Sequence, residues 1–323
     1  MMPVGSTNSQ RTVKFDRPRP VEVGIDTWRL ARYMDSDRER GLVSSFTRGG
    51  LDHPRVGGYR LDYSPASGLL GIEGHPAVEG LGDPAGLIDS EASALTDLRD
   101  AGLPIGREAG VGRLDLTTTL DFGDPRRGLV FLSGLAVVDV PRRQVQIRRA
   151  PGNGPVETVE FRGPSGRSIL SRAYDKGVER AARGDLDRSA PAGHLVRLEA
   201  QNRFAKRARM GATVLARNPE IPAALFKGRF APVADSAEGL TAATADVLGA
   251  ELVRRVQTGE LRGQAAERMS GFLLLRGTGL SAETKRRRRR ELRAHGLVLA
   301  DPFSDPIEVD LGEGVDAALE AWS

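Results

Sequence analysis

Three short segments of the chain alternate charged or polar side chains with apolar ones. They read Arg113-Leu114-Asp115, Arg172-Ala173-Tyr174-Asp175-Lys176 and Arg197-Leu198-Glu199. In an extended chain alternate side chains share a face, so each segment projects its first residue, and every second residue after it, to one side. If the three strands are neighbours in a sheet, one surface holds two carboxylates, a tyrosine, a lysine and several arginines.

Strand-like patterns dominate the chain as far as residue 230. We expect strands over residues 21–30, 69–73, 111–120, 144–149, 157–161, 168–175 and 193–201, and helices over residues 89–101, 127–138 and 202–210. Residues 41–65, rich in glycine and turn formers, predict an irregular hairpin region. The polar residues 1–20 predict a disordered tail. The pattern indicates an α+β fold, with an antiparallel-sheet domain at residues 21–230.

From residue 236 onward the pattern becomes helical. We expect helices over residues 240–258, 261–275 and 281–294 and a short strand over 297–299. Ser281 suits the N-cap of the third helix, and Gly296 suits its end. This order predicts a small helical domain at residues 236–323, of the helix-turn-helix or winged-helix kind.

Six consecutive basic residues lie in the third of these helices: Lys285, Arg286, Arg287, Arg288, Arg289 and Arg290. Runs of this kind are often solvated helix faces. Leu292 is the single apolar anchor of this helix, and so polar a helix stays folded most easily when part of it lies on a polyanion. We therefore interpret the run as a duplex-DNA-binding surface.

Composition narrows the class of protein. The chain has 323 residues, enough for two domains that each bury a core. It has no cysteine, which excludes disulfide scaffolds and thiolate metal sites. The first twenty residues lack the apolar core of a signal peptide, and the longest apolar runs are far too short to cross a bilayer. We expect a cytoplasmic protein with no membrane partner.

The residues of the expected polar surface favour phosphodiester chemistry. A tyrosine such as Tyr174 can attack phosphorus and keep the phosphate, but its phenol needs a nearby cation because it is mostly protonated at neutral pH. Asp115 and Glu199 supply the oxygen ligands that Mg²⁺ or Mn²⁺ prefers. Lys176 shares the face of Tyr174 and can offset developing negative charge. Arg113, Arg172 and Arg197 are the candidates for holding the flanking phosphates.

Other titratable residues are weaker candidates for a direct role in this chemistry. Arg-x-Asp and Arg-x-Glu triplets are also common as exposed charged pairs on half-solvated strands. Asp26 is a further candidate acid in the first strand, and His194 is a further candidate near Glu199. Asp175 and Glu179 flank Tyr174, and we interpret both as structural. The four histidines form no His-x-His pair, so no two-histidine metal cluster is expected: His53, His75, His194 and His295.

These segments resemble one family of enzymes. The stretch at residues 171–179, with Tyr174-Asp175-Lys176-Gly177 and Glu179, followed by Arg197-Leu198-Glu199, resembles rolling-circle replication initiators of phages and plasmids. It is most similar to the gene II/X type of filamentous phages, and it is also similar to plasmid replication initiation factors and conjugative relaxases. Weaker similarity covers residues 25–27, 70–74 and 113–115 and the closing segment at 281–296.

The resemblance implies a nicking enzyme. Such an enzyme joins a tyrosine, here Tyr174, to the 5′-phosphate at an origin, leaves a 3′-OH primer, and uses a divalent metal. Its partners would be origin DNA, single-stranded at the nick and duplex at the C-terminal domain, and a host helicase. The chain departs from the family in two ways: the C-terminal helix carries arginine where the family has an aromatic-containing stretch, and only one tyrosine lies in the motif.

Three alternative functions stay open from the sequence. A non-catalytic DNA-binding replication or partition regulator needs the basic helix but not Tyr174. A metal-dependent hydrolytic nuclease uses Asp115 and Glu199 without a covalent step. A conjugative relaxase shares the tyrosine chemistry but acts in DNA transfer.

Overall fold

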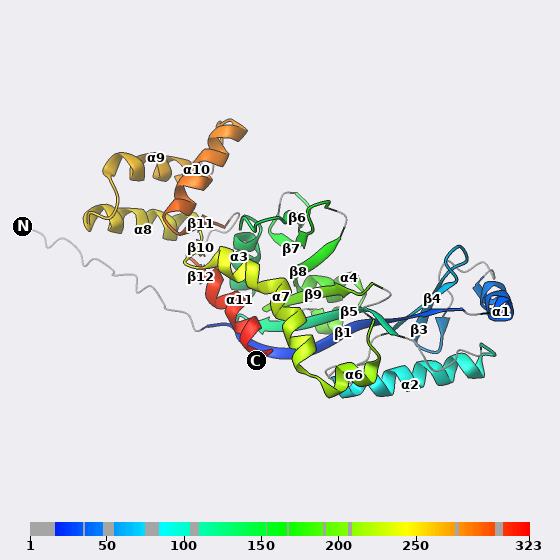
Figure 1. Cartoon of the computed structure of the whole chain (residues 1–323). Helices are drawn as coiled ribbons and strands as arrows, with labels where there is room; N and C mark the ends of the chain where they lie inside the picture. Colours follow the sequence, from blue (N-terminus) through cyan, green and yellow to red (C-terminus); the bar gives the residue numbers. More distant parts are fainter. Residues whose placement is uncertain are drawn as a thin grey trace, which may run out of the picture.

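The computed structural model describes residues 17–34, 36–47, 55–74, 84–103, 110–152, 154–166, 168–189, 192–205, 209–274, 278–300 and 306–323. Within them the chain forms a large antiparallel sheet in the strand order β2-β3-β4-β1-β5-β9-β8-β7-β6 (Figure 1). Its strands are β1 (Arg19–Tyr33), β2 (Arg55–Val56), β3 (Tyr59–Ser64), β4 (Leu69–Gly74), β5 (Gly110–Asp121), β6 (Gln144–Arg149), β7 (Val156–Arg162), β8 (Ile169–Asp175) and β9 (Leu195–Arg203). The expected α+β class with an antiparallel sheet is confirmed.

One face of this sheet is buried by helices. The elements that connect or cover the strands are α1 (Asp37–Thr47), α2 (Pro84–Asp100), α3 (Pro125–Leu135), α4 (Lys176–Ala182), α5 (Leu186–Ser189), α6 (Ala212–Arg217), α7 (Glu220–Ala237) and α11 (Leu311–Glu320). Trp28, Leu114, Ala173 and Leu198 point to this side and are fully buried. Because side chains alternate along a strand, the residues between them point to the other, polar face.

A second, smaller core lies in the C-terminal third of the chain. Here α8 (Ala245–Gln257), α9 (Gly263–Leu274) and α10 (Ala282–Ala294) pack together through Leu252, Met269, Phe272 and Leu292. A three-stranded sheet adjoins them, with β10 (Thr241–Ala243) between β11 (Leu297–Leu299) and β12 (Glu308–Asp310). Figure 1 shows these three helices gathered beyond the end of the large sheet.

The last helix returns to the first core. Leu311 and Val315 of α11 are buried in the same cluster as the large sheet. Trp322 stacks on Phe226 of α7, with 5.3 Å between ring centroids, and its indole N–H donates to Thr118 of β5 over 2.9 Å. The chain after residue 236 is therefore divided between two cores.

Most expected elements match the structure, and three regions differ from the prediction. Residues 202 and 203 extend β9 rather than starting a helix, because they pair with Leu114 and Arg113 of β5. The region at 41–65 contains the end of α1 as well as the β2–β3 hairpin. The chain beyond residue 236 is not helical throughout, since β10 and β12 precede and follow the three helices. Residues 1–16 of the expected tail lie outside the described residues, and β1 already begins at Arg19.

The described residues include no helix with the length and apolar character needed to cross a membrane.

Candidate functional site

The three alternating segments are sheet neighbours, which meets the condition for one shared polar surface. Strand β9 lies between β5 and β8, with Glu199 opposite Thr117 on one side and opposite Arg172 on the other. Tyr174 lies opposite Arg197. Asp115 is two residues along β5 from Thr117, so it is a diagonal neighbour of Glu199 on the same face. The sheet therefore brings both predicted carboxylates and Tyr174 to one polar surface.

Glu199 is at the centre of this surface and is only 1% exposed. Its Oε2 accepts a hydrogen bond of 2.6 Å from Arg172 and one of 3.5 Å from the hydroxyl of Tyr174. Its Oε1 is buried and has no hydrogen-bond partner among the described residues. A buried carboxylate oxygen left without a donor is costly, so this atom is the position at which a further ligand would be stabilised.

Tyr174 is 6% exposed, and its surroundings keep the phenol neutral. Burial raises the pKa of Tyr174 well above its usual value, and the carboxylate of Glu199 raises it further. The guanidinium of Arg172 lies over the ring, with its central carbon 5.2 Å from the centroid, and opposes this shift only in part. Additional positive charge near Glu199 would act in the direction that favours the phenolate.

Asp115 is the second carboxylate, also 1% exposed. It accepts two hydrogen bonds from Arg113, one of 3.0 Å from Nε to Oδ1 and a second from Nη2 to Oδ2. Burial raises the pKa of Asp115 to about 6, and the negative charge of Glu199 contributes to the increase. Arg113 also reaches Glu73 of β4 at 3.4 Å. The two carboxylates therefore interact electrostatically, and Arg113 holds the Asp115 carboxylate in place by hydrogen bonds.

Arg197 is buried and forms hydrogen bonds to three polar side chains of the site. Its three guanidinium nitrogens donate to Thr119 at 3.0 Å, to Asp26 at 2.7 Å and to Glu22. Burial lowers the pKa of Arg197, but the charges of its neighbours, Glu22 and Asp26 among them, outweigh that effect and raise it. To hold a phosphate, as the sequence suggested, Arg197 would have to release these partners. Asp26, a candidate acid, is bound to Arg197.

The ion pairs of Arg197 with Asp26 and Glu22 could not be predicted from the sequence, for two reasons. Asp26 lies at an irregularity of β1, between Ile25 and Thr27, where the register with β5 shifts. Asp26 therefore reaches the polar face although Trp28, which strict alternation puts beside it, is in the core. No local sequence pattern points to Glu22, because its partner Arg197 is 175 residues away in the chain.

Helix α4 begins at Lys176, two residues after Tyr174. Asp175 caps it by accepting from the backbone N–H of Val178 at 2.9 Å, in agreement with the structural interpretation of that residue. Lys176 is buried, and its amine donates to Glu179 at 2.7 Å. Burial lowers the pKa of Lys176, and the charge of Arg197 lowers it further. The charge of Lys176 also lowers the pKa of Glu22, so its amine lies near the ion pairs that Arg197 forms with Glu22 and Asp26.

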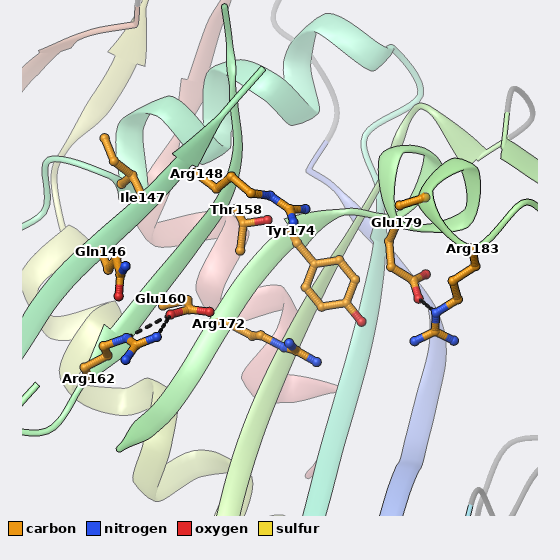
Figure 2. Close-up of a pocket in the computed structure, with 11 residues that line it drawn as sticks. Gln146, Ile147, Arg148, Thr158, Glu160, Arg162, Arg172, Tyr174, Glu179 and Arg183 are labelled. Atoms are coloured by element: carbon orange, nitrogen blue, oxygen red, sulfur yellow. Dashed lines mark hydrogen bonds and ion pairs between the residues drawn. The ribbon is translucent and has the colours of Figure 1, made fainter. Parts of the chain in front are cut away.

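A groove of about 500 Å³ opens beside Tyr174. It is lined by four arginines and two glutamates from β6, β7, β8 and α4: Arg148, Arg162, Arg172, Arg183, Glu160 and Glu179. Figure 2 shows Tyr174 between Arg172 and Glu179, with the Glu160–Arg162 and Glu179–Arg183 ion pairs on either side. Arg148 and Arg183 are each 64% exposed. No local sequence pattern marks β6 and β7 as part of the site, because their contribution depends on strand order.

The basic run lies on α10, as expected. Ser281 caps the helix by accepting from the N–H of Thr284 at 3.2 Å, and Leu292 is the buried anchor. Arg286 and Arg288 are paired within the helix to Glu283 and Glu291. Three arginines of the run are exposed and have no acidic partner in the part of the chain that the structure describes: Arg287, Arg289 and Arg290.

Neither of the two histidines that the structure describes, His194 and His295, forms a hydrogen bond with Tyr174 or Glu199. His194 immediately precedes β9, with its Nε2 3.6 Å from Asp121, and Glu199 is five residues further along the chain. His295 is the C-cap residue of α10. His53 and His75 lie outside the described residues. The described residues hold no cluster of three or more aspartate, glutamate, histidine or cysteine side chains that could bind a metal ion.

A scan of the chain against models of protein families found no match, and a search of curated proteins found none either.

Proposed function

We propose that this chain nicks one strand of DNA at a replication origin by transesterification through Tyr174, in the manner of the rolling-circle initiators that it resembles. One observation carries the proposal: the hydroxyl of Tyr174 lies on a polar sheet face, 3.5 Å from a buried carboxylate and beside an open arginine-lined groove. A reactive hydroxyl beside a proton acceptor and cations is the arrangement that nucleophilic catalysis on phosphorus requires.

In the proposed step the phenol oxygen of Tyr174 attacks the phosphorus of one phosphodiester. A Tyr–O–P bond forms, the P–O3′ bond breaks, and the upstream strand leaves with a 3′-hydroxyl. The phenol proton departs toward Oε2 of Glu199, the acceptor 3.5 Å away, and the O3′ leaving group takes a proton from solvent. Lys176, two residues after Tyr174 in the chain and hydrogen-bonded to Glu179, would offset the negative charge that develops.

The two carboxylates suit a hard divalent cation. Mg²⁺ commonly uses one or two carboxylates and completes its shell with water and substrate phosphate oxygens, so a third protein ligand is not required. Oε1 of Glu199, buried without a hydrogen-bond partner in the described chain, and Asp115 beside it would hold Mg²⁺ or Mn²⁺. When bound, the ion would polarise the scissile phosphate and add the positive charge that Tyr174 lacks.

The groove favours a single strand at the nick. Each of its four arginines is ion-paired to a carboxylate, but Arg148 and Arg183 reach solvent on its rim, where they could contact a phosphate. Among the described residues, the side chains that line it include no aromatic group other than Tyr174, so a strand would be held through phosphates rather than by base stacking. The exposed arginines of α10 belong to a different element and supply a separate, duplex-binding surface.

A denaturing gel tests the proposal. Single strands labelled at the 3′ end and covering a candidate origin are incubated with the protein and Mn²⁺. Because the tyrosine retains the 5′-phosphate of the downstream fragment, the 3′ label should migrate with the denatured protein. Strands labelled at the 5′ end should give a shorter free fragment. Cleavage with both labels on free fragments would indicate a hydrolytic nuclease instead.

A second function, DNA binding without cleavage, is favoured by one observation. Arg113, Arg172 and Arg197 are each ion-paired to a carboxylate rather than left free for phosphates. A chain that uses only its exposed cations would act as a replication or partition regulator. In the same experiment it would shift duplex DNA on a native gel and leave every labelled strand intact on the denaturing gel.

A further inference from the structure

Two arginines meet on the helical side of the large sheet, away from Tyr174. Arg143 precedes β6, and its Nη1 donates to the hydroxyl of Ser171 at 3.2 Å and to the backbone carbonyl of Arg229 at 2.6 Å. Arg229 belongs to α7, and its Nε donates to Oδ1 of Asn202 at 3.1 Å. Four elements therefore converge here: the β6 approach, β8, β9 and α7. Figure 1 shows α7 lying along this part of the sheet.

The side of the sheet follows from strand alternation. Ser171 precedes Arg172 in β8, and Asn202 follows Gln201 in β9, so both point away from the polar face. Ser171 is fully buried and Asn202 is 2% exposed. These two buried side chains fix the positions of the guanidinium groups, which are themselves only partly covered.

Neither arginine has a negative partner. In the described part of the chain, Arg143 and Arg229 form no ion pair, and their hydrogen-bond acceptors are neutral. Burial lowers the pKa of both, and the charge of Arg229 lowers that of Arg143 further. Arg172 and Arg197 differ in this respect, because nearby carboxylates raise the pKa of each. The pair is thus a concentration of half-buried positive charge without compensation.

The turn before β6 fixes Arg143 at some conformational cost. The N–H of Arg143 donates to the carbonyl of Val140 at 3.1 Å, which closes a turn through Pro141 and Arg142. Arg142 has φ of 60°, a left-handed conformation that glycine or asparagine usually adopts. Strained backbone that persists in a folded protein is often associated with a binding function.

We propose that Arg143 and Arg229, supported by Asn202 and Ser171, bind a phosphate group. Each guanidinium has five N–H donors and uses only Nη1 or Nε here, so donors remain on both for the oxygens of one anion. The phosphate is either that of a free nucleotide or inorganic phosphate, or one of a nucleic-acid strand. The site lies on the opposite face from Tyr174, so it holds whether or not Tyr174 cleaves DNA.

The first experiment uses the unaltered protein. Inorganic phosphate is titrated into the full chain at constant ionic strength, and heat and thermal unfolding are recorded, with chloride as the reference anion. The same measurements are made for Arg143→Gln, Arg229→Gln and, as a charge-matched control, Arg217→Gln, which changes an exposed arginine of α6. Circular dichroism confirms that each variant is folded.

Binding of phosphate that weakens about tenfold to a hundredfold in Arg143→Gln and Arg229→Gln, but not in Arg217→Gln, supports the site with a free phosphate as its ligand. If inorganic phosphate does not bind, a labelled single-stranded oligonucleotide distinguishes the second source. Weaker oligonucleotide binding by the two variants, with the control unchanged, then assigns the site to a nucleic-acid phosphate.

Two results overturn the proposal. One is a wild-type protein that binds neither inorganic phosphate nor the oligonucleotide, a measurement that does not depend on the folding of any variant. The other is equal affinity of wild type and both folded variants for whichever ligand binds. Tyrosine-linked DNA is scored separately, so a failure of the nicking proposal is not confused with a failure of this one.

Discussion

The hydroxyl of Tyr174 donates to the same oxygen of Glu199 that accepts a 2.6 Å hydrogen bond from Arg172. This arrangement joins the proposed nucleophile to a proposed metal ligand through one atom. Burial and the charge of Glu199 together raise the pKa of the phenol and keep it protonated, and the charge of Arg172 stabilises the carboxylate. Any change at Glu199 should therefore alter both metal dependence and the state of the nucleophile.

We expect Tyr174→Phe to abolish nicking and to leave the fold intact. The covalent route needs the phenol oxygen, so activity should fall by more than about a thousandfold. The hydrogen bond lost is 3.5 Å long, at the limit of such contacts, so the free energy of unfolding should change by less than about 1 kcal/mol. Tyr63→Phe, on β3, is the matched control and should nick normally. Adduct formation by Tyr174→Phe would remove Tyr174 from the mechanism.

We expect Glu199→Gln and Asp115→Asn to lose activity that depends on Mg²⁺ or Mn²⁺. Both substitutions keep the shape of the side chain and remove the charged oxygens that a hard cation requires. Asp62→Asn, a change at an exposed carboxylate on β3, should behave as wild type. The measurement is nicking against metal concentration, with a chelator as the zero point. Full wild-type nicking in the chelator would contradict the metal assignment.

The pH dependence of stability should identify Asp115. Its pKa is raised from 3.8 to about 6 in the folded protein, so between these values the folded state holds a proton that the unfolded state has released. The unfolded state binds fewer protons, and the contribution of Asp115 to stability therefore falls as the pH rises through this window. Below 3.8 both states are protonated, and above 6 the cost is fully present.

Urea unfolding from pH 3.5 to 7 checks this expectation by comparing wild type with Asp115→Asn, whose side chain does not titrate. Relative to the variant, wild type should lose stability as the pH rises through the interval that begins at 3.8 and ends near 6. A constant difference between the two proteins across that interval would show that the Asp115 carboxyl is not destabilised by burial.

The sequence could predict the polar face but not its pairings. Alternation within a strand is local, so the three segments at Asp115, Tyr174 and Glu199 were recognisable without the fold. The partners of Arg197 were not, because Glu22 and Asp26 come from β1 and reach it across β5. Strand order and the irregular register near Asp26 bring them there, and neither is encoded in a short motif.

The helix predicted over residues 202–210 was wrong at its first two residues, because a local pattern does not report strand pairing. Residues 202–210 carry a basic, helix-compatible sequence, yet Asn202 and Arg203 continue β9. Pairing with β5 satisfies their backbone groups, and Asn202 gains a partly buried hydrogen bond from Arg229. Tertiary contacts therefore override the propensity of this segment. The α10 helix was predictable because both its cap and its end depend on neighbouring residues only.

The last prediction concerns α10. We expect duplex DNA to bind through the exposed arginines of this helix, and replacing Arg287, Arg289 and Arg290 together with alanine should weaken that binding. Each phosphate neutralised on duplex DNA contributes about 0.9 to the slope of log affinity against log salt, so a variant that loses up to three contacts should show a flatter slope. The readout is fluorescence anisotropy of labelled duplex at several salt concentrations.

A control variant separates this surface from net charge. It replaces three exposed arginines of α1, α2 and α6 with alanine: Arg38, Arg99 and Arg217. Both variants lose the same charge, so only a local contact makes the α10 variant weaker than the control. Nicking of a short single strand should survive in both, because that reaction depends on the sheet site. Equal affinities and equal salt slopes in the two variants would mean that the basic run is a solvated helix face.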